Sequence, residues 1–268
     1  MTVEEKMTTG EVGFDATRDT GILRITFTRA DRMNALDYRT LVALAEEIER
    51  AGSDPEVRVI VLTGTGRAFC SGADLVSVGE SRGAGITPTD SMDAANRLVR
   101  AIVRVPVPVI ARVTGAAAGI GASLAIAADL AYATENSYLL LAFVNIGLMP
   151  DGGASALVAA SAGRALAAEM ALLGERLPAA EAKAAGLITD VVADDEIDAR
   201  VEKAAQKIAS GPRRALELTK RAVNAAALTA LDDALAREHE GQTELLSSSD
   251  FVEGVSAMLG KRPAQFGS

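Results

Sequence analysis

Two kinds of sequence pattern divide this chain, and the change between them limits what it can fold into. From residue 21 to about residue 134, short β-type runs alternate with helical ones. After about residue 152 the β-type runs almost disappear, and Ala, Leu, Glu, Lys and Arg dominate in stretches of helical periodicity. This order predicts an α/β core of repeated strand–strand–helix units, followed by an all-helical tail.

The strands of the first half are expected from short apolar or alternating runs. Residues 22–27 alternate between apolar and polar side chains, as a half-buried strand does. The other runs of β type are more uniformly apolar and are expected to be buried strands. They lie at residues 58–63, 107–113, 129–134 and 138–141.

Helices are expected between these strands and throughout the tail. Asp37 can cap a helix that continues through Arg50. A loop is expected over residues 79–90, and a Gly- and Ala-rich turn precedes a small-residue helix that ends at Ala128. The remaining helices are expected near residues 90–103, 153–173, 178–185, 194–209, 212–227, 230–247 and 250–259.

Composition excludes several classes of function. With 27 Lys and Arg against 36 Asp and Glu, the net charge is −9, so the chain lacks the excess of cations with which a nucleic-acid partner would be bound. Cys70 is the single cysteine and His239 the single histidine, which rules out intrachain disulfides and a Cys- or His-rich metal site. We expect no metal.

The sequence also argues against a membrane segment. The longest uncharged run, residues 113–128, is shorter than the roughly 18–20 residues that a spanning helix needs. Residues 1–13 hold three Glu and no apolar stretch, unlike a signal peptide. We therefore expect a cytoplasmic protein with no membrane partner.

Two motifs follow the first two expected strands. Residues 29–36 (Arg-Ala-Asp-Arg-Met-Asn-Ala-Leu) form either a solvated loop or a ligand contact with two arginines. Residues 66–75 (Gly-Arg-Ala-Phe-Cys-Ser-Gly-Ala-Asp-Leu) form a tight turn that can point backbone N–H groups at a ligand oxygen. Within it, Cys70 is interpreted as a small buried hydrophobe rather than a nucleophile, because no histidine lies nearby in sequence.

Two further motifs follow later strands. Residues 115–123 (Gly-Ala-Ala-Ala-Gly-Ile-Gly-Ala-Ser) lack the spacing of a dinucleotide or Walker loop, so they either allow close helix packing or supply a second N–H donor. Residues 146–153 (Ile-Gly-Leu-Met-Pro-Asp-Gly-Gly) contain Asp151. This aspartate either caps the next helix or, with its pKa raised by apolar surroundings, transfers protons.

In this order and spacing, the motifs resemble those of the crotonase (enoyl-CoA hydratase/isomerase) superfamily, from about residue 14 to the C-terminus. The resemblance implies a spiral of ββα units over residues 1–200 and a C-terminal helical trimerisation region over residues 201–268. It implies self-association as a homotrimer or a dimer of trimers, and an acyl-CoA thioester substrate, with coenzyme A as part of the substrate rather than a cofactor. The matching stretches are residues 29–36, 68–75, 113–129, 143–153, 179–188 and 251–263.

The resemblance also implies site residues. The backbone N–H groups of Ser71 and Ile120 would bind the thioester oxygen and stabilise an enolate. Ile120 stands where the family usually has Gly, and Met258 where a neighbouring subunit's aromatic would reach the coenzyme A. The residues implied to contact coenzyme A or the acyl group are Arg29, Ala30, Arg32, Met33, Ala68, Gly72, Ala73, Asp74, Leu75, Phe143, Met258 and Lys261.

The acids depart from those of the family's hydratases, which use two Glu where this chain has Ser123 and Phe143. Asp151 matches the place where single-carboxylate enoyl-CoA isomerases keep their acid, and residues 143–153 are also similar to isomerases of ring-epoxidised phenylacetyl-CoA. We therefore expect an isomerase that converts a 3-enoyl-CoA to a 2-enoyl-CoA through an enolate, with Asp151 as the catalytic proton shuttle. The alternatives are an enoyl-CoA hydratase and a non-catalytic acyl-CoA-binding protein.

Overall fold

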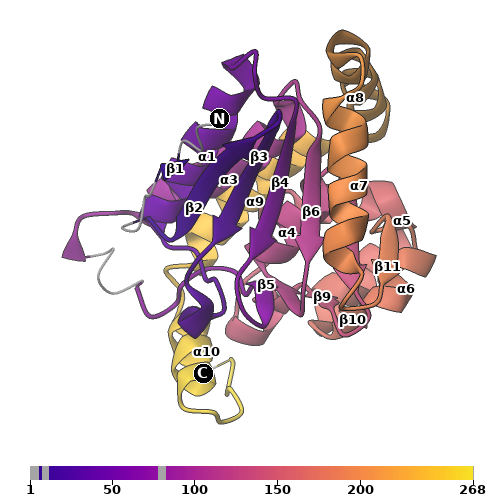
Figure 1. The fold of residues 1–268 in the computed structure, drawn as a ribbon. Helices are drawn as coiled ribbons and strands as arrows, with labels where there is room; N and C mark the ends of the chain where they lie inside the picture. Colours follow the sequence, from indigo (N-terminus) through magenta and orange to yellow (C-terminus); the bar gives the residue numbers. More distant parts are fainter. Residues whose placement is uncertain (1–5, 8–11, 78–82, 268) are drawn as a thin grey trace.

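The computed structural model describes residues 6–7, 12–77 and 83–267, and its strands form two sheets (Figure 1). In strand order, the large sheet consists of β1 (Lys6–Met7), β2 (Phe14–Asp19), β3 (Ile22–Phe27), β4 (Val59–Gly64), β6 (Val109–Val113), β8 (Leu130–Thr134) and β11 (Asp190–Val192). The small sheet consists of β10 (Arg176–Pro178), β9 (Tyr138–Leu140), β7 (Ala116–Ala118) and β5 (Ala68–Cys70).

Three strand–strand–helix units follow one another, as the sequence predicts. They are β4–β5–α3, β6–β7–α4 and β8–β9–α5. The first strand of each unit lies in the large sheet and the second in the small sheet, and within each sheet these strands are parallel neighbours. The turn between the second strand and the helix is therefore presented at the same edge of the small sheet in each unit.

The helices cover the large sheet on both faces. On one face, α7 packs over a cluster that includes Ile22, Val59 and Ile110. On the other, the main core joins the sheet to α1, α3, α4, α5, α6 and α9, and Leu235 of α9 belongs to it. In chain order the helices are α1 (Tyr38–Ser53), α3 (Pro88–Arg104), α4 (Ile120–Ala127), α5 (Ala154–Leu173), α6 (Ala179–Ala184), α7 (Ile197–Ala209), α8 (Arg213–Ala227), α9 (Leu231–Leu245) and α10 (Ser249–Leu259).

Local capping explains where the helices of the first half begin. The Asp37 side chain accepts a hydrogen bond from the Thr40 N–H at 2.8 Å, which confirms it as the cap of α1. Helix α3 begins at Pro88, two residues before the expected start, because Thr87 caps it and Asp90 completes a capping box. The expected loop at 79–90 is therefore too long at its end, and residues 78–82 lie outside the described chain.

Strands β1 and β2 precede the first strand expected from the sequence, so the pattern of the chain did not predict them. Three further strands were also not expected: β7 occupies part of the predicted Gly- and Ala-rich turn, and β10 and β11 lie in the segment predicted to be helical. Each of these three has three residues, and its partners in the sheet rather than its own side chains hold it extended. Residue 200, where we expect the core to give way to the tail, lies inside α7, so that division stays a prediction.

Helix α5 is, in the part of the chain that the structure describes, the one helix long and apolar enough to cross a membrane. Its Gly163 has φ 83°, which breaks the regular helix, and Arg164 and Glu169 lie within it. Its Leu157, Val158 and Met170 are buried in the protein core.

Candidate active site

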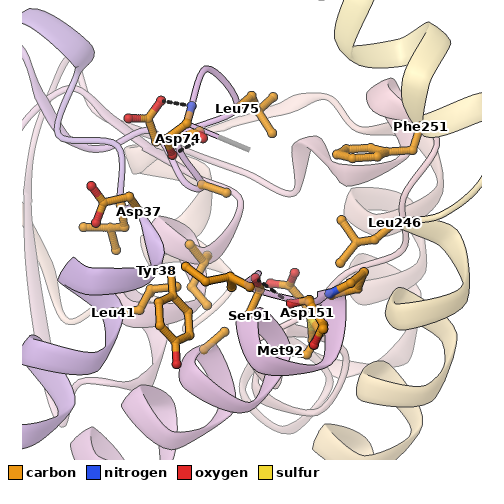
Figure 2. A pocket seen from close by; sticks show the side chains of 18 residues that line it. Asp37, Tyr38, Leu41, Asp74, Leu75, Ser91, Met92, Asp151, Leu246 and Phe251 are labelled. Atoms are coloured by element: carbon orange, nitrogen blue, oxygen red, sulfur yellow. Dashed lines mark hydrogen bonds between the residues drawn. The ribbon is translucent and has the colours of Figure 1, made fainter. Parts of the chain in front are cut away.

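A cavity of about 130 Å³ lies between α1, α3, the turn after β5 and the junction of α9 with α10 (Figure 2). This is close to the size of an engineered cavity, about 150 Å³, that binds benzene. Most of its side chains are apolar, and Asp151 is one of its few acids. It is lined by Leu36, Asp37, Tyr38, Leu41, Ala73, Asp74, Leu75, Ser77, Ile86, Thr87, Pro88, Ser91, Met92, Ala95, Ile120, Asp151, Leu246 and Phe251.

The turn after β5 brings a free backbone donor to this cavity. Leu36 donates its N–H to the Gly72 carbonyl at 2.8 Å, and Asp74 donates to the Leu36 carbonyl at 2.9 Å. In this parallel bridge, neither the N–H nor the carbonyl group of Ala73 forms a hydrogen bond with Leu36. Within the described residues its N–H makes no hydrogen bond, so it is available to a ligand.

The expectation that Ser71 supplies this donor is wrong. The Ser71 N–H donates to the Met33 carbonyl at 3.0 Å, so it is already occupied. Gly72, at φ 102°, turns the chain between Ser71 and Ala73, and the two N–H groups do not share one direction. The donor that the cavity receives is that of Ala73, two residues further on.

A second donor comes from the start of α4. Ile120 is the first residue of this helix, where an N–H has no acceptor within the helix, and none of the described residues accepts from it. The positive end of the helix dipole lies at the same place. Gly119, at φ 53° and ψ −131°, precedes it and adopts a backbone conformation that favours glycine. Ile120 thus lies where the sequence predicts a donor.

Asp151 lies in the turn just before α5. Its Oδ2 accepts a hydrogen bond from Nε2 of Gln242 at 2.8 Å. Its Oδ1 is buried and has no hydrogen-bond partner among the described residues. The alternative that Asp151 caps α5 is wrong, because the first N–H groups of that helix donate to Glu238 instead, from Gly153 at 2.6 Å and Ser155 at 3.0 Å.

The surroundings of Asp151 bring the pKa of its carboxyl group close to neutral pH. Burial raises the pKa of Asp151 to about 7, the hydrogen bond from Gln242 lowers it, and the negative charge of Glu238 raises it. At neutral pH this carboxyl group is present in both protonation states. It can therefore both remove and return a proton, as general acid–base catalysis requires.

The other two carboxyl groups that line the cavity are paired. Asp74 is buried and accepts hydrogen bonds from both Arg29 and Arg32. Burial raises the pKa of Asp74, but the hydrogen bonds and charges of Arg32 and Arg29 outweigh it, so its pKa is lowered. Asp37 lies 3.2 Å from Arg29 and caps α1. Asp74 therefore stays ionised, and neither acid matches Asp151 as a proton carrier, because each is paired with arginine.

The two positions at which hydratases of the family carry Glu hold no acid here. The Ser123 hydroxyl is buried and donates to the Asp151 carbonyl oxygen at 2.9 Å, so Ser123 holds the Asp151 turn in place. Phe143 lies in a 3₁₀ turn (Ala142–Ile146) and is buried beside Gly119. It is not among the residues that line the cavity.

The remaining residues implied to bind coenzyme A fall into three groups. Ala73, Asp74 and Leu75 line the cavity, whereas Ala68 and Gly72 are buried and do not line it. Met258, near the end of α10, and Lys261, just after this helix, are exposed and do not line this chain's cavity. Their contact with a neighbouring subunit stays a prediction, as do the contacts of the turn residues, which do not line the cavity: Arg29, Ala30, Arg32 and Met33.

Several cavity residues were missed by the sequence reasoning. Tyr38 and Leu41 come from α1, and Phe251 from α10, at the start of a stretch that carries the family resemblance. Glu238 and Gln242 of α9 contact the Asp151 turn. A signal for these two exists in the sequence, because they continue, at helical spacing, the buried face formed by Leu231, Ala234 and Leu235.

Comparison with known proteins gives the family. Residues 17–268 match the enoyl-CoA hydratase/isomerase family. The 1,2-epoxyphenylacetyl-CoA isomerase of Escherichia coli K12 is 37% identical, covering 92% of this chain and 95% of its own length. The 2,3-dehydroadipyl-CoA hydratase of the same strain is 34% identical, over 93% and 96%.

A solved structure agrees with these relatives. An enoyl-CoA hydratase from Mycobacterium avium subsp. paratuberculosis K-10 is 48% identical, covers 96% of this chain and 99% of its own, and superposes with a TM-score of 0.89. With its strand–strand–helix units, its apolar cavity and its paired backbone donors, this chain belongs to the enoyl-CoA hydratase/isomerase family of the crotonase superfamily, whose members are acyl-CoA enzymes.

Proposed function

We propose that this chain is an acyl-CoA isomerase that converts a 3-enoyl-CoA to a 2-enoyl-CoA. One observation carries the proposal: an apolar cavity is lined by the backbone N–H donors of Ala73 and Ile120 and by the carboxyl group of Asp151. Within the described chain, neither N–H makes a hydrogen bond and Asp151 has no arginine partner. Moving a double bond needs a group that removes one proton and returns it elsewhere. It needs no water, metal or redox cofactor.

The proposed reaction has two proton transfers. The Asp151 carboxylate removes a proton from C2, and the electron pair moves to the thioester oxygen. The N–H groups of Ala73 and Ile120 stabilise the resulting oxyanion of the conjugated dienolate. Asp151 then returns the proton to C4, the carbonyl forms again and the double bond lies between C2 and C3. Protons and electrons balance within the substrate and Asp151.

The identity of the acids favours this reaction over hydration. A hydratase of the family activates water with a second carboxyl group, whereas Ser123 here donates to the Asp151 backbone and Phe143 is a buried hydrocarbon. The relative named 1,2-epoxyphenylacetyl-CoA isomerase also supports isomerisation. The cavity volume of about 130 Å³ favours an acyl group about the size of one six-membered ring.

We further propose that the enzyme acts in the cytoplasm as a trimer or a dimer of trimers. Large apolar side chains of the single chain are exposed on α5, α8 and α10, including Leu172 at 72%, Val223 at 58% and Val252 at 60%. Covering them by self-association would remove this apolar surface from water. Light scattering at micromolar concentration should give at least three times the chain mass, and a monomer would contradict the proposal.

The test of function separates three outcomes. The protein is incubated with a 3-enoyl-CoA and, separately, with a 2-enoyl-CoA. The products are separated by chromatography, and their molecular masses are measured by mass spectrometry. Isomerisation leaves the mass unchanged and creates a conjugated thioester, hydration adds the mass of one water, and a binding protein changes neither substrate.

The Asp151→Asn variant assigns the base. Its side chain keeps the shape of Asp151, and Asp151 is not among the residues expected to contact coenzyme A, so folding and affinity should persist. Isomerase kcat should fall at least about 10²-fold, the low end of what a positioned general base contributes. The exposed Asp195, changed to Asn, is the matched control. Near wild-type isomerisation by Asp151→Asn would show that another group moves the proton.

A further inference from the structure

Two polar side chains of α9 are buried directly behind the Asp151 turn. Glu238 and Gln242 are each only 1% exposed and lie four residues apart on the face of the helix that Leu231 and Leu235 otherwise make apolar. Burial of an amide and a carboxyl group is costly unless each is hydrogen-bonded. The hydrogen bonds of both side chains go to residues 149–155.

Gln242 contacts one carboxyl oxygen of Asp151, and the orientation of its amide group is fixed by a second hydrogen bond. Its Oε1 accepts from the Met149 N–H at 3.2 Å, and its Nε2 donates to Asp151 Oδ2 at 2.8 Å. A backbone N–H can only donate, so this contact fixes which end of the amide is oxygen. The NH₂ group therefore faces Asp151, and Oδ2 carries a donor while Oδ1 has none.

Glu238 places a carboxyl group behind the same turn. Three groups donate to its two oxygens: the Gly153 N–H, the Ser155 N–H and the Ser155 hydroxyl. Its own pKa is raised by burial, while these donors and Arg237 act against that rise. The other carboxyl groups around the cavity, Asp37 and Asp74, are paired with arginine.

We propose that Gln242 is a positioning residue that holds Asp151 by Oδ2 and leaves Oδ1 as the one oxygen that exchanges the substrate proton, with Glu238 opposing Gln242 through its charge. This inference rests on the proposed function of Asp151. When Asp151 is protonated, the proton sits on Oδ1, because Oδ2 already faces an N–H donor. The same oxygen thus takes the proton from C2 and returns it at C4, on one face of the dienolate.

The two α9 side chains act on Asp151 in opposite directions, which makes the inference testable. The hydrogen bond from Gln242 lowers the pKa of Asp151, and the charge of Glu238 raises it. Removing Gln242 should make Asp151 harder to deprotonate, and removing the charge of Glu238 should make it easier. A residue that served only to pack α9 against the turn would not produce shifts of opposite sign.

The experiment compares Gln242→Leu with Thr243→Val. Thr243 is the next residue of α9, and its buried hydroxyl has no partner among the described residues, so Thr243→Val is a control that makes the same helix more apolar. Titration of Asp151 is followed in the intact protein by infrared spectroscopy, through the carboxyl band that disappears in Asp151→Asn. The pH profile of kcat/KM is measured on the same samples.

In Gln242→Leu, the midpoint of the Asp151 titration should rise by about one pH unit, the change expected when a hydrogen bond to a charged group is lost. The ascending limb of kcat/KM should move by the same amount, and kcat at high pH should fall more than KM changes. Glu238→Gln should move the midpoint down, and Thr243→Val should leave it unchanged. Gln242→Glu, which keeps an acceptor for Met149, should also raise it.

An unchanged midpoint in both Gln242→Leu and Gln242→Glu would overturn the proposal, as would a downward shift in either. If Gln242→Leu or Glu238→Gln does not fold, Gln242→Glu and Thr243→Val decide alone. Failure of the proposed function is distinguishable, because the infrared titration needs no turnover. An Asp151→Asn variant that still isomerises would refute the function while leaving the shift in the Asp151 band intact.

Discussion

Gly72 and Gly119 meet backbone to backbone: a Cβ atom on Gly72 would lie 3.5 Å from Cα of Gly119 and 2.9 Å from the Ala118 carbonyl oxygen. This contact joins the turn after β5 to the turn before α4. The two donors of the proposed oxyanion site, Ala73 and Ile120, each follow one of these glycines. Their relative placement therefore depends on the absence of side chains at the contact.

Gly72→Ala should impair catalysis more than it impairs folding. The new methyl group would meet the Ala118 carbonyl, and φ 102° is strained for alanine, so the Ala73 N–H should move away from its partner donor. We expect kcat/KM to fall about 10²-fold, the effect of a displacement near 1 Å at a reacting group. Gly83→Ala is the control, because a Cβ there meets nothing within 4 Å. Equal rates in the two variants would show that the turns do not align the donors.

Replacement of one backbone N–H by an ester oxygen tests the donor itself. Lactic acid in place of Ala73 removes an N–H that makes no hydrogen bond in the described chain, so the melting temperature should be retained. Loss of one oxyanion donor should lower kcat about 10²–10³-fold. The corresponding ester at Ser71 removes the bond to Met33 instead, so it should cost about 1 kcal/mol of stability and little rate. The reverse pattern would restore Ser71 as the donor.

The error at Ser71 shows what the sequence could not supply. The turn, its glycines and the presence of a donor follow from a local pattern, and the structure has all of them. Which N–H is free depends on φ at Gly72 and on an acceptor 38 positions earlier in the chain, the Met33 carbonyl. Neither is encoded in the spacing of residues 66–75.

A similar division holds for the rest of the fold and the site. The strand–strand–helix order and the cap at Asp37 depend on neighbouring residues, so the sequence predicts them well. Strands β7, β10 and β11 are extended because of their partners, and Gln242 reaches Asp151 across 91 residues. Such contacts exist only once the chain has folded.

Cys70 should be dispensable for catalysis. Its side chain is fully buried, and burial raises the pKa of its thiol to about 12, so it stays protonated at neutral pH. Cys70→Ala keeps the backbone of the turn, and kcat/KM should stay within about tenfold of wild type, or roughly 1.4 kcal/mol. As the single cysteine, it should react with iodoacetamide only after unfolding, which mass spectrometry of the whole protein reads directly. Rapid alkylation of the native protein, with loss of activity, would contradict this assignment.

The free energy of unfolding should depend on pH through the titration of Asp151. Its pKa is about 7 in the folded chain, mainly through burial, against 3.8 for an ordinary aspartate side chain. The folded state therefore binds this proton more tightly than the unfolded state. The stabilisation is complete below about pH 4 and is lost as the pH rises to about 7, by at most about 1.4 kcal/mol for each pH unit in that window.

Asp151→Asn removes this titration, so the difference in unfolding free energy between variant and wild type should grow in favour of the variant from pH 4 to pH 7 and stay constant above it. Urea unfolding at intervals of half a pH unit measures this difference, with Asp195→Asn as the exposed control that should show no such trend. The pH dependence of the rate should have the opposite direction, because the proposed base acts as a carboxylate. We expect kcat/KM to rise with pH to a plateau above about pH 7. Coincidence of the two midpoints would identify the group that destabilises the fold with the group that moves the proton. A stability difference that is flat from pH 4 to pH 7 would show that Asp151 titrates at its ordinary pKa, and would remove the physical basis for its proposed role at neutral pH.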